Sequence, residues 1–130
     1  MDKLEEAQHP ETTPERLVEL ARDTTPTVRY GVAQHPDTPA SVLDELSRDA
    51  YVAVRYGVAQ HPDTPASVLD ELSRDESSLV RQGVAMNPNT SDSTIVLLTK
   101  DSDITTANAA RTTFDARNSN TVMWAMGHAY

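Results

Sequence analysis

A 26-residue repeat constrains this chain more than any other feature of its sequence. Residues 33–49 read AQHPDTPASVLDELSRD, and residues 59–75 repeat this segment without a difference. A fixed period of this length predicts stacked units, because each unit is too small to bury its apolar face alone. We expect a single domain over residues 1–130, with repeats at about 7–32, 33–58, 59–84 and 85–115 and a C-terminal capping half-repeat at 116–130.

Each repeat is expected to contain two short helices. The first begins at Thr38-Pro39 and again at Thr64-Pro65, because threonine is a good N-cap and proline suits the first helical position. The second contains valines four residues apart, which share a helix face, and must end near His61, since Pro62 disfavours helical conformation at the residue before it. The sequence leaves open which of the two is a 3₁₀ helix. No segment shows strand alternation with hairpin turns, so we predict an all-α fold without a sheet.

Several of these repeated segments resemble those of the leucine-rich repeat variant family over about residues 7–110. They are the HPDTP strings and their counterpart Asn87-Pro88-Asn89-Thr90, the VLDEL strings, and the Val-Arg-x-x-Val-Ala segments. The resemblance implies a right-handed superhelix, an α-solenoid of alternating α and 3₁₀ helices, and a bacterial source. Some family members carry a cysteine-bound iron–sulfur segment ahead of the repeats. This chain has no cysteine, so the resemblance implies no such cofactor here.

Composition excludes further classes. The 130 residues include 20 acidic and 11 basic side chains, a net charge of −9 that disfavours sequence-independent nucleic-acid binding. The absence of cysteine excludes a disulfide framework and a cysteine-rich zinc site. No apolar run approaches the roughly 20 residues of a membrane helix, and residues 1–20 have no signal-peptide pattern. We therefore expect a cytoplasmic protein without a membrane segment.

Glycine recurs inside the second helix of three successive repeats, at positions 31, 57 and 83. A glycine inside a helix costs about 1 kcal/mol relative to alanine, so its recurrence predicts close approach between helices of neighbouring repeats.

His9, His35 and His61 form a row at the repeat spacing. Packed helices lie about 8–10 Å apart, whereas the ligands of one zinc ion converge at about 2.0–2.1 Å. We therefore interpret these histidines as structural groups before proline, and we predict no metal site.

Two rows of basic side chains also follow the repeat. The row of Arg22, Arg48, Arg74 and Lys100 is followed at each next residue by an aspartate, namely Asp23, Asp49, Asp75 and Asp101. This alternation predicts inter-repeat ion pairs and a solvated edge, each exposed pair contributing about 0–1 kcal/mol. A phosphate-binding stripe is the alternative, and the net charge disfavours it.

The second basic row gives the candidate partner-binding residues. These are Arg29 with Tyr30, Arg55 with Tyr56, and Arg81 with Gln82. Exposed aromatic side chains beside arginines are typical of binding hot spots. Two helical steps separate Tyr30 from Val28, so its ring should point away from the valine face. In the alternative interpretation each tyrosine ring covers the neighbouring repeat and keeps its hydroxyl in water.

The C-terminal repeat departs from the pattern, as a cap should. We expect a longer second helix over about 103–116, with an inner face of Ile104, Ala107, Ala110 or Arg111, and Phe114. In the half-repeat that follows, Met123 and Trp124 are expected to seal the last apolar face, and Met126 to take the leucine position.

No motif of a catalytic site is present: the chain has no Gly-rich phosphate loop, HExxH or GxSxG. We predict a monomeric, non-enzymatic module that binds a protein partner and has no cofactor. A nucleic-acid-binding solenoid with an arginine-lined face, and a structural spacer or regulatory module beside other domains, remain the alternatives.

Overall fold

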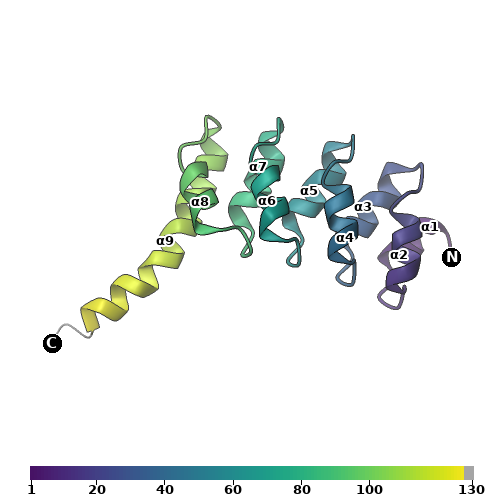
Figure 1. Cartoon of the computed structure of the whole chain (residues 1–130), viewed down its shortest axis with the longest axis horizontal. Helices are drawn as coiled ribbons and strands as arrows, with labels where there is room; N and C mark the ends of the chain where they lie inside the picture. Colours follow the sequence, from purple (N-terminus) through teal and green to yellow (C-terminus); the bar gives the residue numbers. More distant parts are fainter. Residues whose placement is uncertain (128–130) are drawn as a thin grey trace.

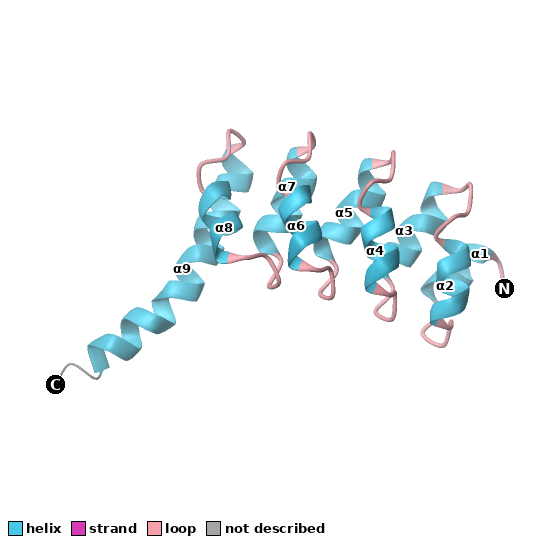
Figure 2. Ribbon diagram, in the orientation of Figure 1, coloured by secondary structure: helices cyan, strands magenta, loops and turns pink. Residues whose placement is uncertain are grey.

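The computed structural model of the chain describes the backbone of residues 1–127 and the side chains of residues 1–119. Residues 1–127 are all-helical and contain no strand (Figure 2). Their nine helices are α1 (Lys3–Gln8), α2 (Pro14–Leu20), α3 (Pro26–Gln34), α4 (Ala40–Leu46), α5 (Val52–Gln60), α6 (Ala66–Leu72), α7 (Ser78–Met86), α8 (Asp92–Leu98) and α9 (Ile104–Gly127).

Helix boundaries follow the 26-residue period. The short helices α2, α4, α6 and α8 begin at residues 14, 40, 66 and 92, and α3, α5, α7 and α9 begin at 26, 52, 78 and 104. α3, α5 and α7 end at residues 34, 60 and 86, each directly before the His-Pro or Asn-Pro pair. The predicted helix end near His61 is confirmed, since His61 is the C-cap of α5.

The helices are arranged as pairs that follow one another along the molecule (Figure 1). α1, α3, α5, α7 and α9 pack side by side in one row. Each seven-residue helix between them packs on the helix that precedes it and the helix that follows it. The odd-numbered helices therefore form one continuous row along the molecule.

Both helices of a pair are α-helices wherever the structure describes them. The alternation of α and 3₁₀ helices that the family resemblance implies is not observed in residues 1–127.

The expected threonine caps of α4 and α6 are wrong. Pro39 and Pro65 take the N-cap positions, and Thr38 and Thr64 lie outside the helices. Their buried hydroxyl groups donate to the last turn of the preceding helix, as Thr64 Oγ1 does to the Val58 carbonyl at 2.7 Å. Among the four short helices, threonine is the N-cap only in α2, where the Thr13 hydroxyl accepts from the Arg16 N–H. The repeated threonine thus satisfies a helix C-terminus, whose last carbonyls lack helical partners.

The core is a thin seam of small aliphatic side chains between the two rows. Each middle repeat contributes two valines and an alanine from its odd-numbered helix, and one valine and two leucines from its short helix. In the central repeat these fully or nearly fully buried residues are Val54, Val58, Ala59, Val68, Leu69 and Leu72. Burial is shared between neighbouring units, which explains a core built from few side chains per repeat.

The repeated glycines lie where neighbouring helices approach most closely. A Cβ atom added to Gly57 would lie 3.0 Å from Ala33 Cβ, and one added to Gly83 would lie 2.9 Å from Ala59 Cβ. A Cβ at Gly31 would meet Ala7 Cβ at 2.9 Å. The predicted close approach between repeats is confirmed at all three positions.

α9 differs from its prediction at its end. Its start agrees within one residue, but it continues unbroken to Gly127 instead of ending near Ala116, and its C-terminal part extends away from the row (Figure 1). The segment from Ala116 repeats the segment from Ala85, but Ser119 occupies the place of Pro88. Without that proline nothing removes a helical N–H or blocks the preceding residue, so the helix continues.

The predicted inner face of α9 is correct only in its centre. Ala107 and Ala110 are buried, whereas Ile104 is 65% exposed and Phe114 is 39% exposed. Thr113, and not Phe114, faces α7 in this part of the helix, and its Oγ1 donates to the Ala85 carbonyl at 2.7 Å. Met123, Trp124 and Met126 lie outside the described side chains.

Candidate interaction surface

Arg29, Arg55 and Arg81 are fixed in ion pairs between repeats. Each Nε donates to the aspartate twenty residues ahead, at 2.7 Å to Asp49, 2.8 Å to Asp75 and 2.9 Å to Asp101. Each Nη2 donates to the second oxygen of the same carboxylate at 3.1–3.2 Å, so every pair is bidentate. The arginine side chains are only 12–16% exposed and the aspartate side chains 9%.

These pairs join into one ladder along the odd-numbered helices. The Nη1 of each arginine also donates to a backbone carbonyl of its own repeat, as Arg55 does to Asp49 O at 2.9 Å. Each carboxylate accepts the N–H two residues on, as Asp75 Oδ1 does from Ser77 at 2.9 Å. We call Arg29, Asp49, Arg55, Asp75, Arg81 and Asp101 the arginine–aspartate ladder.

The charges of the ladder stabilise one another. The hydrogen bond from Arg81 holds the pKa of the Asp101 carboxyl below its ordinary value, and the hydrogen bond from Asp101 raises the pKa of Arg81. Asp49 and Asp75 likewise raise the pKa values of Arg29 and Arg55. These arginines are therefore engaged inside the chain and offer little of their guanidinium groups to a phosphate or a partner.

The histidine row forms a second ladder. His61 Nε2 donates to the His35 carbonyl at 2.8 Å, and His35 Nε2 donates to the His9 carbonyl at 2.8 Å. In the next repeat Asn87 takes this place and donates to the His61 carbonyl at 2.9 Å. At the end of the row Arg117 donates to the Asn87 carbonyl at 3.4 Å.

The ring nitrogens of this ladder have fixed roles. The Nδ1 atoms of His35 and His61 accept the N–H groups of Asp37 and Asp63 at 3.0 Å, so each Nε2 carries the proton that it donates. Both histidines are almost fully buried, at 2% and 3% exposure. Both ring nitrogens are thus in use, and no group of three His, Asp or Glu side chains among the described residues could hold a metal ion.

The other basic row has partners different from those expected. Arg22 pairs with Glu45 of the next repeat at 3.3 Å, and Arg48 pairs with Asp44 at 3.2 Å and with Glu71 of the next repeat at 3.6 Å. The adjacent aspartates instead pair with the three arginines of the arginine–aspartate ladder, except for Asp23, which pairs with Lys3. Inter-repeat pairs of this row therefore form at Arg22 and Arg48, with glutamates of the short helices, whereas Arg74 pairs with Asp70 of its own helix at 3.3 Å. All of these pairs lie in solvent.

Tyr30 and Tyr56 cover the glycine of the following helix. A Cβ at Gly57 would lie 3.4 Å from the Tyr30 ring, and one at Gly83 would lie 3.3 Å from the Tyr56 ring. Both rings are half-buried against the core, and the Tyr56 hydroxyl accepts the amide of Gln60 at 2.8 Å on the surface. This arrangement agrees with the alternative interpretation, in which the ring packs on the neighbouring repeat and the hydroxyl stays accessible.

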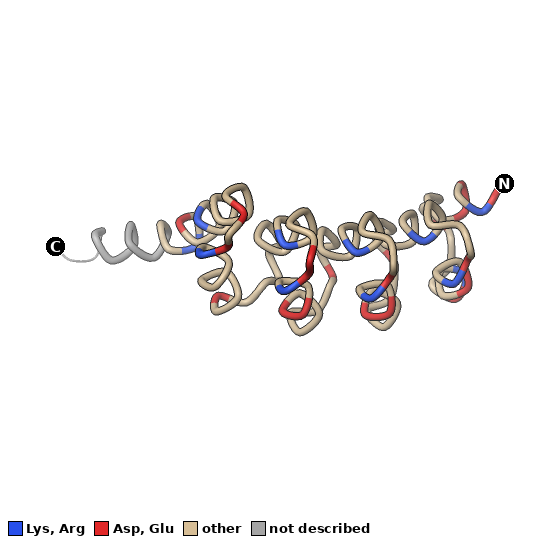
Figure 3. Tube along the Cα trace, turned by 90° about the horizontal axis from the view of Figure 1, so that it is seen from above, with Lys and Arg blue, Asp and Glu red and all other residues tan. Residues whose placement is uncertain are grey.

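The outward face of α3, α5 and α7 carries no charged side chain. It consists of three exposed or half-buried positions per helix, spaced i, i+3 and i+7: Thr27, Tyr30, Gln34, Ala53, Tyr56, Gln60, Leu79, Gln82 and Met86. We call these nine residues the uncharged stripe. Acidic residues gather instead on the short helices and their loops (Figure 3). In a chain with a net charge of −9, an uncharged stripe across three repeats is the most distinctive surface feature.

Only part of the uncharged stripe was included among the sequence candidates. Tyr30, Tyr56 and Gln82 belong to it, but Gln34, Gln60 and Met86 were missed, although they lie four residues further along the same helix faces. Met86 is 66% exposed and Leu79 is 42% exposed, so the stripe becomes more apolar along α7.

Two hollows repeat along the uncharged stripe. The α3–α5 groove has a volume of about 160 Å³ and is lined by Ala33, Gln34, Gly57, Gln60, His61 and Pro62. The α5–α7 groove has a volume of about 210 Å³ and is lined by Tyr56, Gln60, Gly83, Met86, Asn87 and Pro88. Five residues of the second groove lie 26 positions after five residues of the first. Both grooves therefore come from the same register of the repeat.

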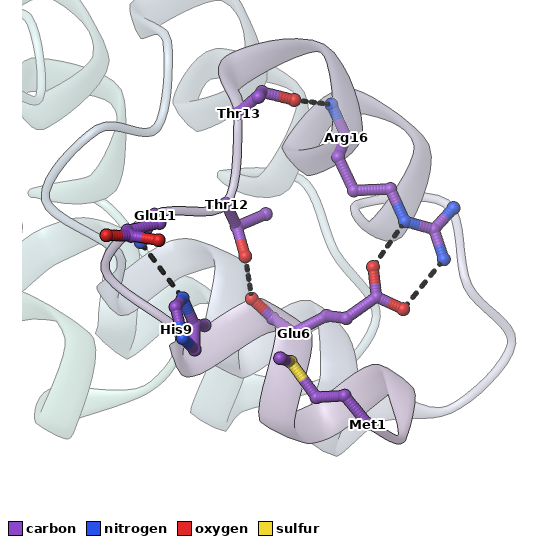
Figure 4. A pocket seen from close by; sticks show the side chains of 7 residues that line it. All are labelled: Met1, Glu6, His9, Glu11, Thr12, Thr13 and Arg16. Atoms are coloured by element: carbon purple, nitrogen blue, oxygen red, sulfur yellow. Dashed lines mark hydrogen bonds and ion pairs between the residues drawn. The ribbon is translucent and has the colours of Figure 1, made fainter.

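A larger hollow of about 400 Å³ lies between α1 and α2 (Figure 4). Two of its charged groups are paired with each other: Arg16 Nε and Nη2 donate to the two oxygens of Glu6 at 2.7 and 3.1 Å. This hydrogen bonding lowers the pKa of Glu6 and raises that of Arg16. Glu6 is thus held ionised and paired, an arrangement that does not suit a general acid or base.

Comparison with protein-family models, with curated protein sequences and with solved structures finds no match to this chain. Within the described residues no helix is both long enough and apolar enough to cross a membrane.

Proposed function

We propose that the chain is a non-enzymatic protein-interaction module and that the uncharged stripe is its binding surface. The observation that carries the proposal is the uncharged character of this face on a strongly acidic molecule. Charged residues are depleted at the centres of protein interfaces, where tyrosine and methionine are enriched. Both residue types occur on this stripe, at Tyr30, Tyr56 and Met86.

The proposal assigns the arginines a structural role. Arg29, Arg55 and Arg81 were candidate binding residues, but each is committed to a bidentate ion pair and a backbone carbonyl. An arginine that binds a partner would have to abandon these bonds. The same commitment argues against nucleic-acid binding through an arginine-lined face.

We also propose that the molecule is a right-handed α-solenoid of the leucine-rich repeat variant type. The 26-residue recurrence of helix starts, and two hydrogen-bonded ladders that link each repeat to the next, support this proposal. A solenoid places equivalent side chains in rows, which is the arrangement that an extended binding surface requires.

The experiment compares two double variants that add the same charge at the same repeat spacing. Gln34→Lys/Gln60→Lys places two cations in the uncharged stripe, and Ala40→Lys/Ala66→Lys places two at exposed starts of the short helices. Affinity capture from lysate of the native host, quantified by mass spectrometry, should lose the specific partners at least tenfold with the stripe variant only. Equal capture by the stripe variant and the wild type would refute the proposal.

A further inference from the structure

The two grooves of the uncharged stripe are each large enough for one small side chain. Their volumes of about 160 and 210 Å³ are several times the roughly 30 Å³ that a water molecule occupies in the liquid. They fall below the roughly 300–1,000 Å³ of pockets that bind drug-sized molecules. A peptide that places one side chain in each groove can therefore fill both.

The spacing of the grooves selects among extended chains. Consecutive grooves are one repeat apart, and packed helices lie about 8–10 Å apart. A polyproline II helix rises about 3.1 Å per residue with three residues per turn, so residues i and i+3 lie about 9.3 Å apart on one face. In a β-strand, residues i and i+2 share a face but lie only about 6.6 Å apart, and i and i+3 face opposite sides. Polyproline II conformation therefore matches the repeat.

The chemistry of the groove walls also suits this conformation. A polyproline II segment makes no internal hydrogen bonds, so its carbonyl groups need donors. The amide of Gln60 uses one N–H for the Tyr56 hydroxyl and has a second. Gln34 bonds Tyr30 in the same way at 2.8 Å. Aromatic-lined grooves are a common means of binding proline-rich segments, and Tyr56 lines the α5–α7 groove.

We propose that the α3–α5 and α5–α7 grooves bind an uncharged proline-rich peptide segment in polyproline II conformation, with proline or another small apolar residue at every third position. The absence of charge from the stripe selects a segment without charge, because a charged residue would lose its hydration there without gaining a partner. This inference rests on the function proposed above and names the class of its partner.

The test is an NMR titration of the ¹⁵N-labelled full chain with capped 12-residue peptides. (Pro-Pro-Ala)₄ presents the proposed conformation, (Gly-Gly-Ala)₄ has the same length without it, and (Ala-Ala-Gln)₄ is an uncharged helix former. We expect saturable shifts of the Gln34 and Gln60 side-chain amides with the proline peptide and at least tenfold weaker binding of the other two. Gln34→Lys/Gln60→Lys should weaken the proline peptide at least tenfold, and Ala40→Lys/Ala66→Lys should not.

Any of three results would overturn the inference. The proline peptide could cause no chemical-shift changes in the uncharged stripe, the glycine peptide could bind as tightly as the proline peptide, or both lysine variants could lose affinity for the proline peptide equally. If the helix-forming peptide binds the stripe and the proline peptide does not, the protein-interaction function stands and the polyproline partner is wrong. The same holds if no peptide binds but capture from lysate still depends on Gln34 and Gln60. If capture is also insensitive to these residues, both proposals fail.

Discussion

At the scale of single residues, one aspartate per repeat joins three parts of the molecule. The Asp75 carboxylate accepts two hydrogen bonds from the Arg55 guanidinium and one from the Ser77 N–H in the loop that follows it. Its backbone carbonyl accepts a hydrogen bond from Arg81 Nη1 at 2.8 Å. The pair is mostly shielded from water, so it is screened less than the exposed pairs of the short helices. This is why the ladder, and not the outer ion pairs, should be measurable in stability.

The last ladder pair gives a pH-dependent prediction. Asp101 binds a proton less readily in the folded chain than in the unfolded chain, because Arg81 lowers its pKa. The stability from this carboxylate is therefore complete above the ordinary carboxyl pKa of about 4, and is lost as the pH falls through the lower folded value. Arg81→Gln should cost about 2 kcal/mol at pH 7, and the difference from wild type should shrink below pH 4.

Urea unfolding between pH 3 and pH 7 measures this effect. Arg74→Gln is the matched control, since Arg74 is 66% exposed and its pair with Asp70 is solvated. A difference between wild type and Arg81→Gln that stays constant with pH would contradict the assigned role of the Asp101 pair.

The histidine ladder predicts which substitution its positions accept. Asn87 performs in its repeat the bond that His61 performs one repeat earlier. His61→Asn should therefore keep the link to the His35 carbonyl and change stability by less than about 1 kcal/mol. His61→Leu should cost about 1–3 kcal/mol, because it removes the bond to the His35 carbonyl, which keeps only the Thr38 N–H, and leaves the Asp63 N–H without its acceptor. Thermal unfolding of both variants checks this, and equal costs would show that the bond contributes nothing.

At the scale of elements, the sequence predicted helix boundaries well where proline sets them. Odd-numbered helices end before Pro10, Pro36, Pro62 and Pro88, and α9 does not end at Ser119, which stands in the fifth such place. Prediction from the sequence failed where one side chain had two possible hydrogen-bond or ion-pair partners. Thr38 could cap its own helix or a neighbouring carbonyl, and Arg29 could face a partner or Asp49. Packing decided both, and packing is not local in sequence.

The helix contact at Gly57 gives a prediction at this scale. Alanine there would gain about 1 kcal/mol of helix propensity. Its Cβ would meet Ala33 Cβ, which belongs to a rigid helix, and overpacking of this kind costs about 1–3 kcal/mol. Gly57→Ala should therefore destabilise the chain by about 1 kcal/mol net.

A double-mutant cycle isolates this contact. The Ala33→Gly change removes the opposing methyl group, so it should cost less in the Gly57→Ala background than in wild type, by about 1 kcal/mol. The measurement is urea unfolding of the four proteins. Stabilisation by Gly57→Ala alone would show that the helices are not held this close.

At the scale of the whole molecule, contacts run mainly between neighbouring repeats, so the number of repeats should be adjustable. Removal of residues 59–84 joins residue 58 to Ala85 and places Arg55 twenty residues before Asp101. The arginine–aspartate spacing is thereby kept, and Asn87 faces the His35 carbonyl. The shortened chain should fold cooperatively, be less stable than wild type, and be shorter by about 8–10 Å in solution scattering.

The control deletion removes residues 65–84, which breaks the 26-residue register. This chain should lose its cooperative transition, because neither ladder can form across the junction. If both deletions fold equally well, the repeat is not the unit of the structure.

Site-specific photo-crosslinking in cells of the native host tests directly whether the uncharged stripe contacts the partner. A photoreactive phenylalanine analogue replaces Gln34 or Gln60 in the uncharged stripe, or Ala40 or Ala66 on the short helices, all of them exposed positions. Binding through the uncharged stripe predicts protein adducts of defined mass from positions 34 and 60 and none from 40 and 66. Adducts from positions 40 and 66 alone would place the partner on the charged side of the molecule and contradict the claim.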